Sequence, residues 1–155
     1  MKMEGEERME YIQEIRSKIG TRPLIIVGST VLVHDEQERV LFQLRSDTEE
    51  WGLPGGAMEP GESLEETAGR ELWEETGLQA SEFTLLGTLS GEEFYFQYPN
   101  GDEVYNVIAV FRADQTKGKL SVSNAESEAL RFFSIDALPS PLDERAKLVL
   151  EAVNT

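Results

Sequence analysis

The sequence contains no cysteine and only one histidine, His34. Without cysteine the chain cannot form disulfides, thiolate nucleophiles or zinc sites with sulfur ligands. His34 stands beside a predicted hairpin turn and is interpreted as a surface residue. This leaves very little material for a serine–histidine triad or a histidine metal cluster, so we expect any general base to be a carboxylate.

Basic residues are also scarce: 14 Lys and Arg stand against 30 Asp and Glu, and the formal net charge is -16. This balance argues against binding of long nucleic acids, because that affinity comes from Lys and Arg side chains that meet phosphates. A small phosphate compound can still bind if divalent cations lie between the two anions. The alternative is that the charge only keeps the protein soluble, and composition alone favours that interpretation.

Long apolar runs are absent as well. No stretch approaches the length of a membrane span, and the acidic N-terminus lacks the pattern of a signal peptide. We therefore expect a cytoplasmic protein without membrane contacts. With 155 residues, of which 39% are hydrophobic, the chain is long enough for one domain with its own core, and we expect residues 1–155 to form it.

Hydrophobic periodicity predicts an α/β fold. Apolar residues at helical spacing predict an amphipathic helix over residues 6–19. Ser63, with Glu66 three residues later, predicts the capped start of a second helix, which ends before Gly77. Strands are predicted over residues 24–34 and 39–46, as a hairpin, and over 81–90, 92–99, 103–113 and 129–135; a closing helix is predicted over 140–153. This order indicates a mixed sheet with helices on both faces.

The second helix is unusually acidic. Residues 55–78, "GGAMEPGESLEETAGRELWEETGL", hold seven glutamates and a single basic residue, Arg70. Glu71, Glu74 and Glu75 share one helix face, which lies beside an apolar stripe, so their carboxylates could form an oxygen cage for a hard divalent cation. Arg70 stands four residues from Glu66 and from Glu74 and can pair with either. The alternative is a solvated acidic face, as in most such helices; the glycines that precede the helix favour a ligand site.

The same residues resemble the Nudix box of the MutT-like Nudix hydrolases. That pattern is Gly, five residues, Glu, seven residues, Arg-Glu, an apolar residue, any residue, Glu-Glu, any residue, Gly and an apolar residue. The preceding "WGLPGG" is also typical of the family. The resemblance implies a Nudix-type α/β/α sandwich with a mixed β-sheet over residues 20–153. The positions that match are Gly56, Glu62, Arg70, Glu71, Leu72, Glu74, Glu75, Gly77 and Leu78.

This resemblance implies hydrolysis of the pyrophosphate bond in a nucleoside diphosphate linked to another group, with Mg²⁺ or Mn²⁺ as cofactor. Candidate substrates are ADP-ribose, a nucleotide sugar or a dNTP. The implied catalytic residues are Arg70, Glu71 and Glu74, with Glu71 as a candidate base. A later loop, "SNAESEAL", offers Glu126 and Glu128 as alternative bases, or is simply solvated. The implied metal ligands are the Gly55 carbonyl, Glu62, Glu71, Glu74 and Glu75.

Residues that would select the substrate are less clearly marked. Arg45, just before the glycine loop, could reach a phosphate or be a surface arginine. Trp51 could cover a base, although packing under the loop is favoured. Phe96 and Tyr98 share one face of a strand, where a base could stack if that face is exposed, whereas the core is the default.

Two alternatives to a pyrophosphohydrolase were weighed. A Nudix-fold isomerase of isoprenyl diphosphates is disfavoured, because it is expected to use a cysteine. A non-catalytic module that senses a nucleotide is the other alternative, although such proteins commonly lose glutamates of the box. Residues 6–19 could also mediate a homodimer.

Overall fold

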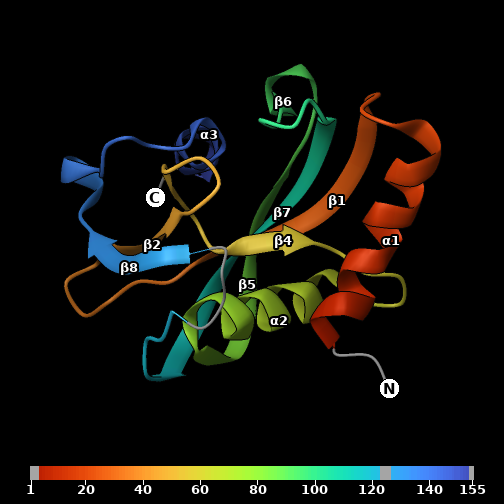
Figure 1. The fold of residues 1–155 in the computed structure, drawn as a ribbon. Helices are drawn as coiled ribbons and strands as arrows, with labels where there is room; N and C mark the ends of the chain where they lie inside the picture. The colour runs from red at the N-terminus through yellow and green to blue at the C-terminus, as the bar shows by residue number, and fades with distance from the viewer. Residues whose placement is uncertain (1–3, 123–126, 154–155) are drawn as a thin grey trace.

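The computed structural model describes residues 4–122 and 127–153, with side chains from Tyr11 onward. Three helices pack around two β-sheets (Figure 1). In chain order the elements are α1 (Glu4–Ile19), β1 (Leu24–Leu32), β2 (Val40–Arg45), β3 (Trp51–Gly52), β4 (Gly55–Ala57), α2 (Leu64–Thr76), β5 (Leu78–Leu89), β6 (Tyr95–Gln97), β7 (Glu103–Gly118), β8 (Ser127–Phe133) and α3 (Glu144–Val153).

The larger sheet has the strand order β4-β1-β7-β5, and β6 pairs with the N-terminal end of β7. Strands β1 and β7 are parallel, from Leu24 beside Val104 to Leu32 beside Arg112, whereas β4, β5 and β6 join antiparallel. The sheet is therefore mixed, as the sequence predicts. The second sheet has the order β3-β2-β8 and is antiparallel.

The predicted hairpin of residues 24–34 and 39–46 is formed only next to its turn. The Leu41 amide donates to the Val33 carbonyl, and His34 bridges Val40, but β2 then leaves β1 and pairs with β3 and β8. The sequence of β2 cannot reveal its partner strands, because four successive residues of β2 are buried and its two faces therefore do not alternate between buried and exposed. The expectation of one sheet is thus corrected to two.

The two faces of the large sheet are covered by different helices. Val31 packs with Leu72 of α2 in one core cluster, and its neighbour Leu32 packs with Val149 of α3 in a second cluster. Successive strand residues point to opposite faces, so β1 forms the centre of both clusters. This confirms helices on both sides of the sheet, as Figure 1 also shows.

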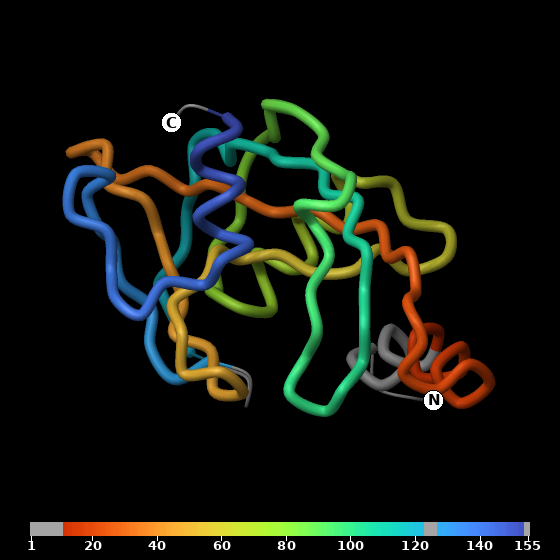
Figure 2. Tube along the Cα trace, turned by 90° about the horizontal axis from the view of Figure 1, so that it is seen from above, coloured from red at the N-terminus to blue at the C-terminus, as the bar shows by residue number. Residues whose placement is uncertain are grey.

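The first and last helices differ from the sequence prediction in detail. Helix α3 begins at Glu144 rather than at residue 140, because Asp143 accepts a hydrogen bond from the Ala146 amide at 3.1 Å and so caps the first turn. Helix α1 lies on the opposite side of the molecule from α3 (Figures 1 and 2). Over the described residues, no helix combines the length and apolarity that a membrane crossing requires.

Candidate active site

Helix α2 has the ends that its sequence predicts. The Ser63 hydroxyl accepts a hydrogen bond from the Glu66 amide at 3.0 Å, and the Glu66 carboxylate accepts one from the Ser63 amide at 2.8 Å. Gly77 closes the helix with φ at 80°, a left-handed conformation that glycine adopts without strain. These caps fix the helical phase and hence the face on which the later glutamates lie.

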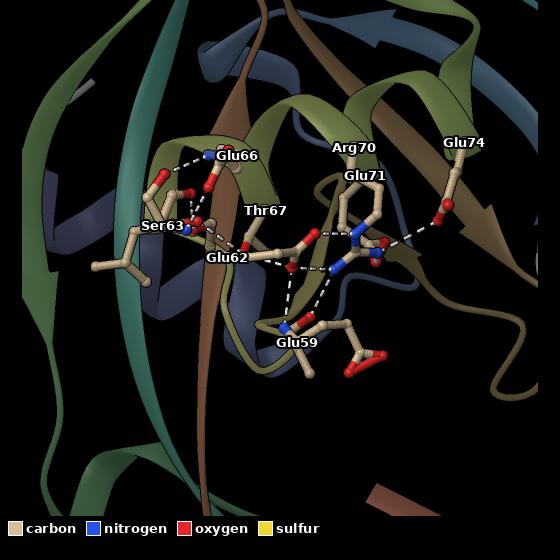
Figure 3. A network of polar contacts seen from close by, with 11 residues as sticks. Glu59, Glu62, Ser63, Glu66, Thr67, Arg70, Glu71 and Glu74 are labelled. Atoms are coloured by element: carbon tan, nitrogen blue, oxygen red, sulfur yellow. Dashed lines mark hydrogen bonds and ion pairs between the residues drawn. The ribbon is translucent and has the colours of Figure 1, made fainter. Parts of the chain in front are cut away.

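Arg70 is the centre of the acidic cluster (Figure 3). Its guanidinium donates to Glu62 at 2.6 and 2.8 Å, to Glu71 at 2.7 Å and to Glu74 at 3.4 Å. A further hydrogen bond reaches the carbonyl of Ala57 in β4 at 2.9 Å. The Arg70 side chain is 14% exposed, so one shielded cation lies among three carboxylates and reduces the repulsion between them.

The sequence spacing offered Glu66 as a partner for Arg70, and the structure corrects this. The Glu66 carboxylate is used in the capping box, and Arg70 turns to Glu62 in the loop before the helix. Hydrogen bonds lower the pKa of Glu62 to about 2, against the opposing effect of desolvation, and the bond from Arg70 is the largest cause. The Glu59 amide and the Thr67 hydroxyl, which donate to Glu62 at 2.9 and 3.0 Å, contribute to the same shift.

Glu75 is held by a different set of donors. Its Oε1 accepts hydrogen bonds from the Gly55 amide at 2.8 Å and from Gln43 Nε2 at 3.2 Å. The Ser127 hydroxyl donates to Gln43 Oε1 at 2.5 Å, which leaves the amide nitrogen of Gln43 facing Glu75. Glu75, Gln43 and Ser127 are 5%, 2% and 6% exposed, so this is a buried polar chain that joins the second sheet to α2.

Gly56 brings the backbone of β4 against the acidic face of α2. A Cβ atom at this position would lie 2.5 Å from Cδ of Glu71 and 2.6 and 2.7 Å from its carboxylate oxygens. Only a residue without a side chain therefore allows the Glu71 carboxylate to rest on β4. This gives a steric reason for the glycine of the box that the sequence could not supply.

A cavity of about 1270 Å³ opens beside this cluster. Seven predicted site residues line it, from the acidic helix, the glycine loop and two further elements: Gly55, Arg70, Glu71, Glu74, Glu75, Arg45 and Tyr98. The structure thus brings most of the predicted catalytic, metal-binding and substrate-binding residues to one place. Arg45 is paired with Asp47, at 2.9 and 3.0 Å, at the edge of this cavity.

Four predicted residues lie elsewhere within the described part of the chain. Glu62 is paired with Arg70 and does not line the cavity, and Glu128 is exposed on β8. Trp51 packs edge-on against Phe133, with ring centroids 5.0 Å apart, which is the packing position that the sequence favoured. Phe96 is partly buried in the second core cluster. Glu126 lies outside the described residues, and the choice of general base stays a prediction.

Residues that the sequence did not single out complete the cavity wall. Arg145 of α3 donates to the Tyr98 hydroxyl at 3.3 Å, and its guanidinium lies 5.0 Å from the centroid of the Phe96 ring. The buried Asn106 of β7 and the neighbouring Ile26 of β1 line the same cavity. No local motif marks these residues, because they meet only after the strands and α3 have packed.

The donor set of the acidic face has the chemistry of a hard-cation site. Glu71, Glu74 and Glu75 present carboxylate oxygens to the cavity beside the backbone of Gly55, and Mg²⁺ and Mn²⁺ prefer oxygen ligands. Within residues 4–122 and 127–153, no three acidic or histidine side chains gather around a common point. Arg70 occupies the centre of the cluster and offsets part of its negative charge.

Comparisons with known proteins agree with this geometry. The family model described as NUDIX domain matches residues 25–153. A provisionally named 8-oxo-dGTP diphosphatase of Bacillus subtilis is 34% identical over 112 residues, which cover 72% of the chain and 68% of that protein. An ADP-ribose pyrophosphatase of Methanocaldococcus jannaschii is 36% identical over 100 residues, 64% of the chain but only 54% of that protein's length.

Solved structures show the same fold. A MutT NUDIX hydrolase from Burkholderia pseudomallei has a TM-score of 0.70 and 30% identity, over 83% of this chain and 97% of that one. The NUDIX domain of Shewanella oneidensis NrtR, in complex with ADP ribose, has a TM-score of 0.65 at 23% identity, over 99% of this chain and 97% of that one. At that identity the second similarity concerns the fold alone.

Proposed function

The chain belongs to the Nudix family of pyrophosphohydrolases, and on this premise we propose that it hydrolyses the pyrophosphate bond of a small nucleotide with the help of Mg²⁺ or Mn²⁺. The observation that carries the proposal is the shared lining of one cavity by Glu71, Glu74 and Glu75 together with Gly55. Carboxylates on a single helix face beside a glycine backbone suit a cation that also binds phosphate oxygens.

Bound divalent ions would neutralise phosphate charge and lower the pKa of the attacking water. In this chain Glu71, Glu74 and Glu75 would hold them. Arg70 orients Glu71 and Glu74 through its hydrogen bonds and limits the repulsion among the carboxylates. A carboxylate accepts the proton of the water that attacks phosphorus, and Glu71 is the candidate that lines the cavity.

The substrate is proposed from the relatives and from the cavity. Relatives with names that refer to oxidised purine nucleotides put 8-oxo-dGTP first, and the ADP-ribose pyrophosphatase puts ADP-ribose second. The cavity adds Arg45 and Arg145, two cations that a phosphate could approach, and the ring of Tyr98. These features suit a phosphorylated nucleoside and do not separate the two candidates.

The test is a substrate panel with Mg²⁺, with Mn²⁺ and with chelator, read by anion-exchange chromatography. It includes dNTPs and their oxidised forms, ADP-ribose, nucleotide sugars and dinucleoside polyphosphates. Release of a nucleoside monophosphate from one class, abolished by chelator, is the expected result. Ligand binding without turnover of any compound would support the non-catalytic sensing module instead.

Single substitutions locate the metal site in the same assay. Glu74→Gln and Glu75→Gln are each expected to lower kcat/KM by about 100-fold or more, since they remove a carboxylate from the site. Glu65→Gln is the matched control, because Glu65 lies on the same helix but is exposed to solvent. Full turnover by both Glu74→Gln and Glu75→Gln would show that the metal site has been assigned wrongly.

A further inference from the structure

Helix α1 lies outside the segment that the family model matches, yet it forms part of the cavity. The match covers residues 25–153, whereas α1 ends at Ile19. Ile12 and Arg16 of α1 nevertheless line the same cavity as the acidic residues of α2. A helix outside the segment that the family model matches thus forms a wall of the cavity, and the question is which part of a substrate that wall meets.

Arg16 fixes α1 in this position. Its guanidinium donates to the carbonyls of Arg22 and Gly20, at 2.6 and 3.1 Å, and to the carbonyl of Glu103 at the start of β7, at 2.6 Å. It also lies 3.7 Å from the Asp102 carboxylate, and its side chain is only 12% exposed. One side chain thus ties the last turn of α1 to the chain that follows it and to β7, which makes the helix a fixed wall.

The charges that this wall brings to the cavity are paired with each other, because Arg16 and Asp102 both line the cavity and lie 3.7 Å apart. Ile12 stands four residues before Arg16 and so shares its helix face. Ile26 of β1 and Asn106 of β7, which are register partners in the parallel pair, also line the cavity. Asn106 is 7% exposed, and its side-chain amide donates to the Phe94 carbonyl at 3.4 Å. Two isoleucines and one amide thus supply a slot of the cavity with apolar surface and a polar edge.

Such a slot suits a nucleobase better than a phosphate, because a base has apolar faces and hydrogen-bonding edges. The charged groups that suit phosphates and cations come instead from α2 and from the α3 side, at Arg45 and Arg145. Figures 1 and 2 both place α1 and α3 on opposite sides of the molecule, so the α1 wall is separated from the wall that carries Arg145.

We propose that α1 is the wall of the nucleobase end of the cavity, with Ile12 in contact with the base and Arg16 as the positioning residue that holds the helix. This rests on the proposed function, since it assumes a nucleotide substrate. Selectivity among bases would then depend on a helix outside the family segment. Ile12→Ala removes the contact and leaves the anchor, whereas Arg16→Met removes the anchor and keeps much of the aliphatic stem.

Two inhibitors distinguish effects at the nucleobase end of the cavity from effects at its phosphate end. A nucleoside monophosphate (AMP or GMP) carries a base, and inorganic pyrophosphate does not. Both variants are expected to weaken competitive inhibition by the nucleoside monophosphate about tenfold and to raise KM with little change in kcat. Inhibition by pyrophosphate is expected to stay unchanged. The matched controls are Ile15→Ala, a half-buried isoleucine of α1 away from the cavity lining, and Lys18→Met, an exposed cation of the same turn.

Equal weakening of both inhibitors, or no weakening of either in Ile12→Ala and Arg16→Met, would overturn the inference. Thermal unfolding of each variant shows whether the domain stays folded, and Ile12→Ala keeps the test valid if Arg16→Met does not. If the wild-type protein hydrolyses nothing in the panel, the proposed function fails. If the wild-type protein turns over a nucleotide and both variants behave like it, the proposed function stands and only the proposed role of α1 fails.

Discussion

Replacing Arg70 by methionine tests whether one cation makes the acidic cluster tolerable. Methionine keeps much of the aliphatic stem but removes every hydrogen bond to Glu62, Glu71 and Glu74 and the one to the Ala57 carbonyl. Because the side chain is only 14% exposed, water cannot easily take over these contacts. We expect the metal-free protein to lose stability and to remain folded at neutral pH.

The magnitude follows from Glu62. In the folded protein its pKa is about 2, compared with 4.5 as the ordinary value, and this difference corresponds to about 3 kcal/mol at neutral pH. Part of this shift comes from the Glu59 amide and the Thr67 hydroxyl, which remain in Arg70→Met, and Glu62 is 19% exposed to screening solvent, so the share lost with Arg70 is about 2 kcal/mol. Loss of the hydrogen bond to the Ala57 carbonyl adds about 1 kcal/mol. The expected loss for Arg70→Met is therefore about 3 kcal/mol at pH 7.

The pH dependence has a defined sign. The pKa of Glu62 is lower in the folded than in the unfolded state, so the stabilisation is fully present above about pH 4.5 and is lost as the pH falls towards 2. The difference between wild type and Arg70→Met should consequently shrink as the pH falls from about 4.5 towards 2, where about 1 kcal/mol from the Ala57 hydrogen bond remains. Urea unfolding followed by circular dichroism, with chelator present, measures both curves. A difference that stays constant from pH 7 to pH 2.5 would refute the reasoning. Arg39→Met, which breaks an exposed pair with Asp35, is the control and should change little.

Three further outcomes are expected. Gly56→Ala should lower turnover strongly with little change in Tm, because the new Cβ would lie 2.5 Å from Cδ of Glu71 and displace only the end of that flexible side chain; activity and thermal unfolding measured on the same preparation check both parts. Gln43→Leu should cost about 2 kcal/mol in urea unfolding, since it removes one of the donors to the buried Glu75 carboxylate and takes away the acceptor of the buried Ser127 hydroxyl. Adding Mg²⁺ or Mn²⁺ should raise Tm in a saturable way in wild type, and an unchanged Tm at millimolar metal would contradict the cation site.

The acidic helix could be predicted from sequence because its determinants are local. Ser63 and Glu66 are three residues apart and form their two hydrogen bonds in any context that allows the helix to start. Gly77 ends it through its own backbone conformation. The shared face of the later glutamates then follows from helical geometry alone. These short-range rules allow the positions of the α2 glutamates to be predicted without a structure.

The other half depends on contacts between distant parts of the chain. Arg145 reaches Tyr98 across 47 residues, and Ser127 reaches Gln43 across 84. Neither pair shows a spacing that a periodic pattern could reveal, because their meeting depends on how the two sheets pack. The division into two sheets was itself missed, since β2 has the same buried pattern whichever strand it joins. Of the expected substrate-binding residues, Arg45 and Tyr98 line the cavity, whereas Trp51 and Phe96 do not.

The acidity of α2 is balanced separately for each part of the helix. Glu66 accepts the amide of the cap, Arg70 pairs with the glutamates around it, and Glu75 accepts the Gly55 amide. Removing a carboxylate and removing the cation should therefore have opposite effects on metal-free stability. Glu74→Gln removes one like charge and should keep or raise Tm while it lowers turnover, whereas Arg70→Met lowers Tm. If both variants lowered Tm equally, the glutamates would be stabilising the fold, and the case for a cation site beside Arg70 would lose its electrostatic basis.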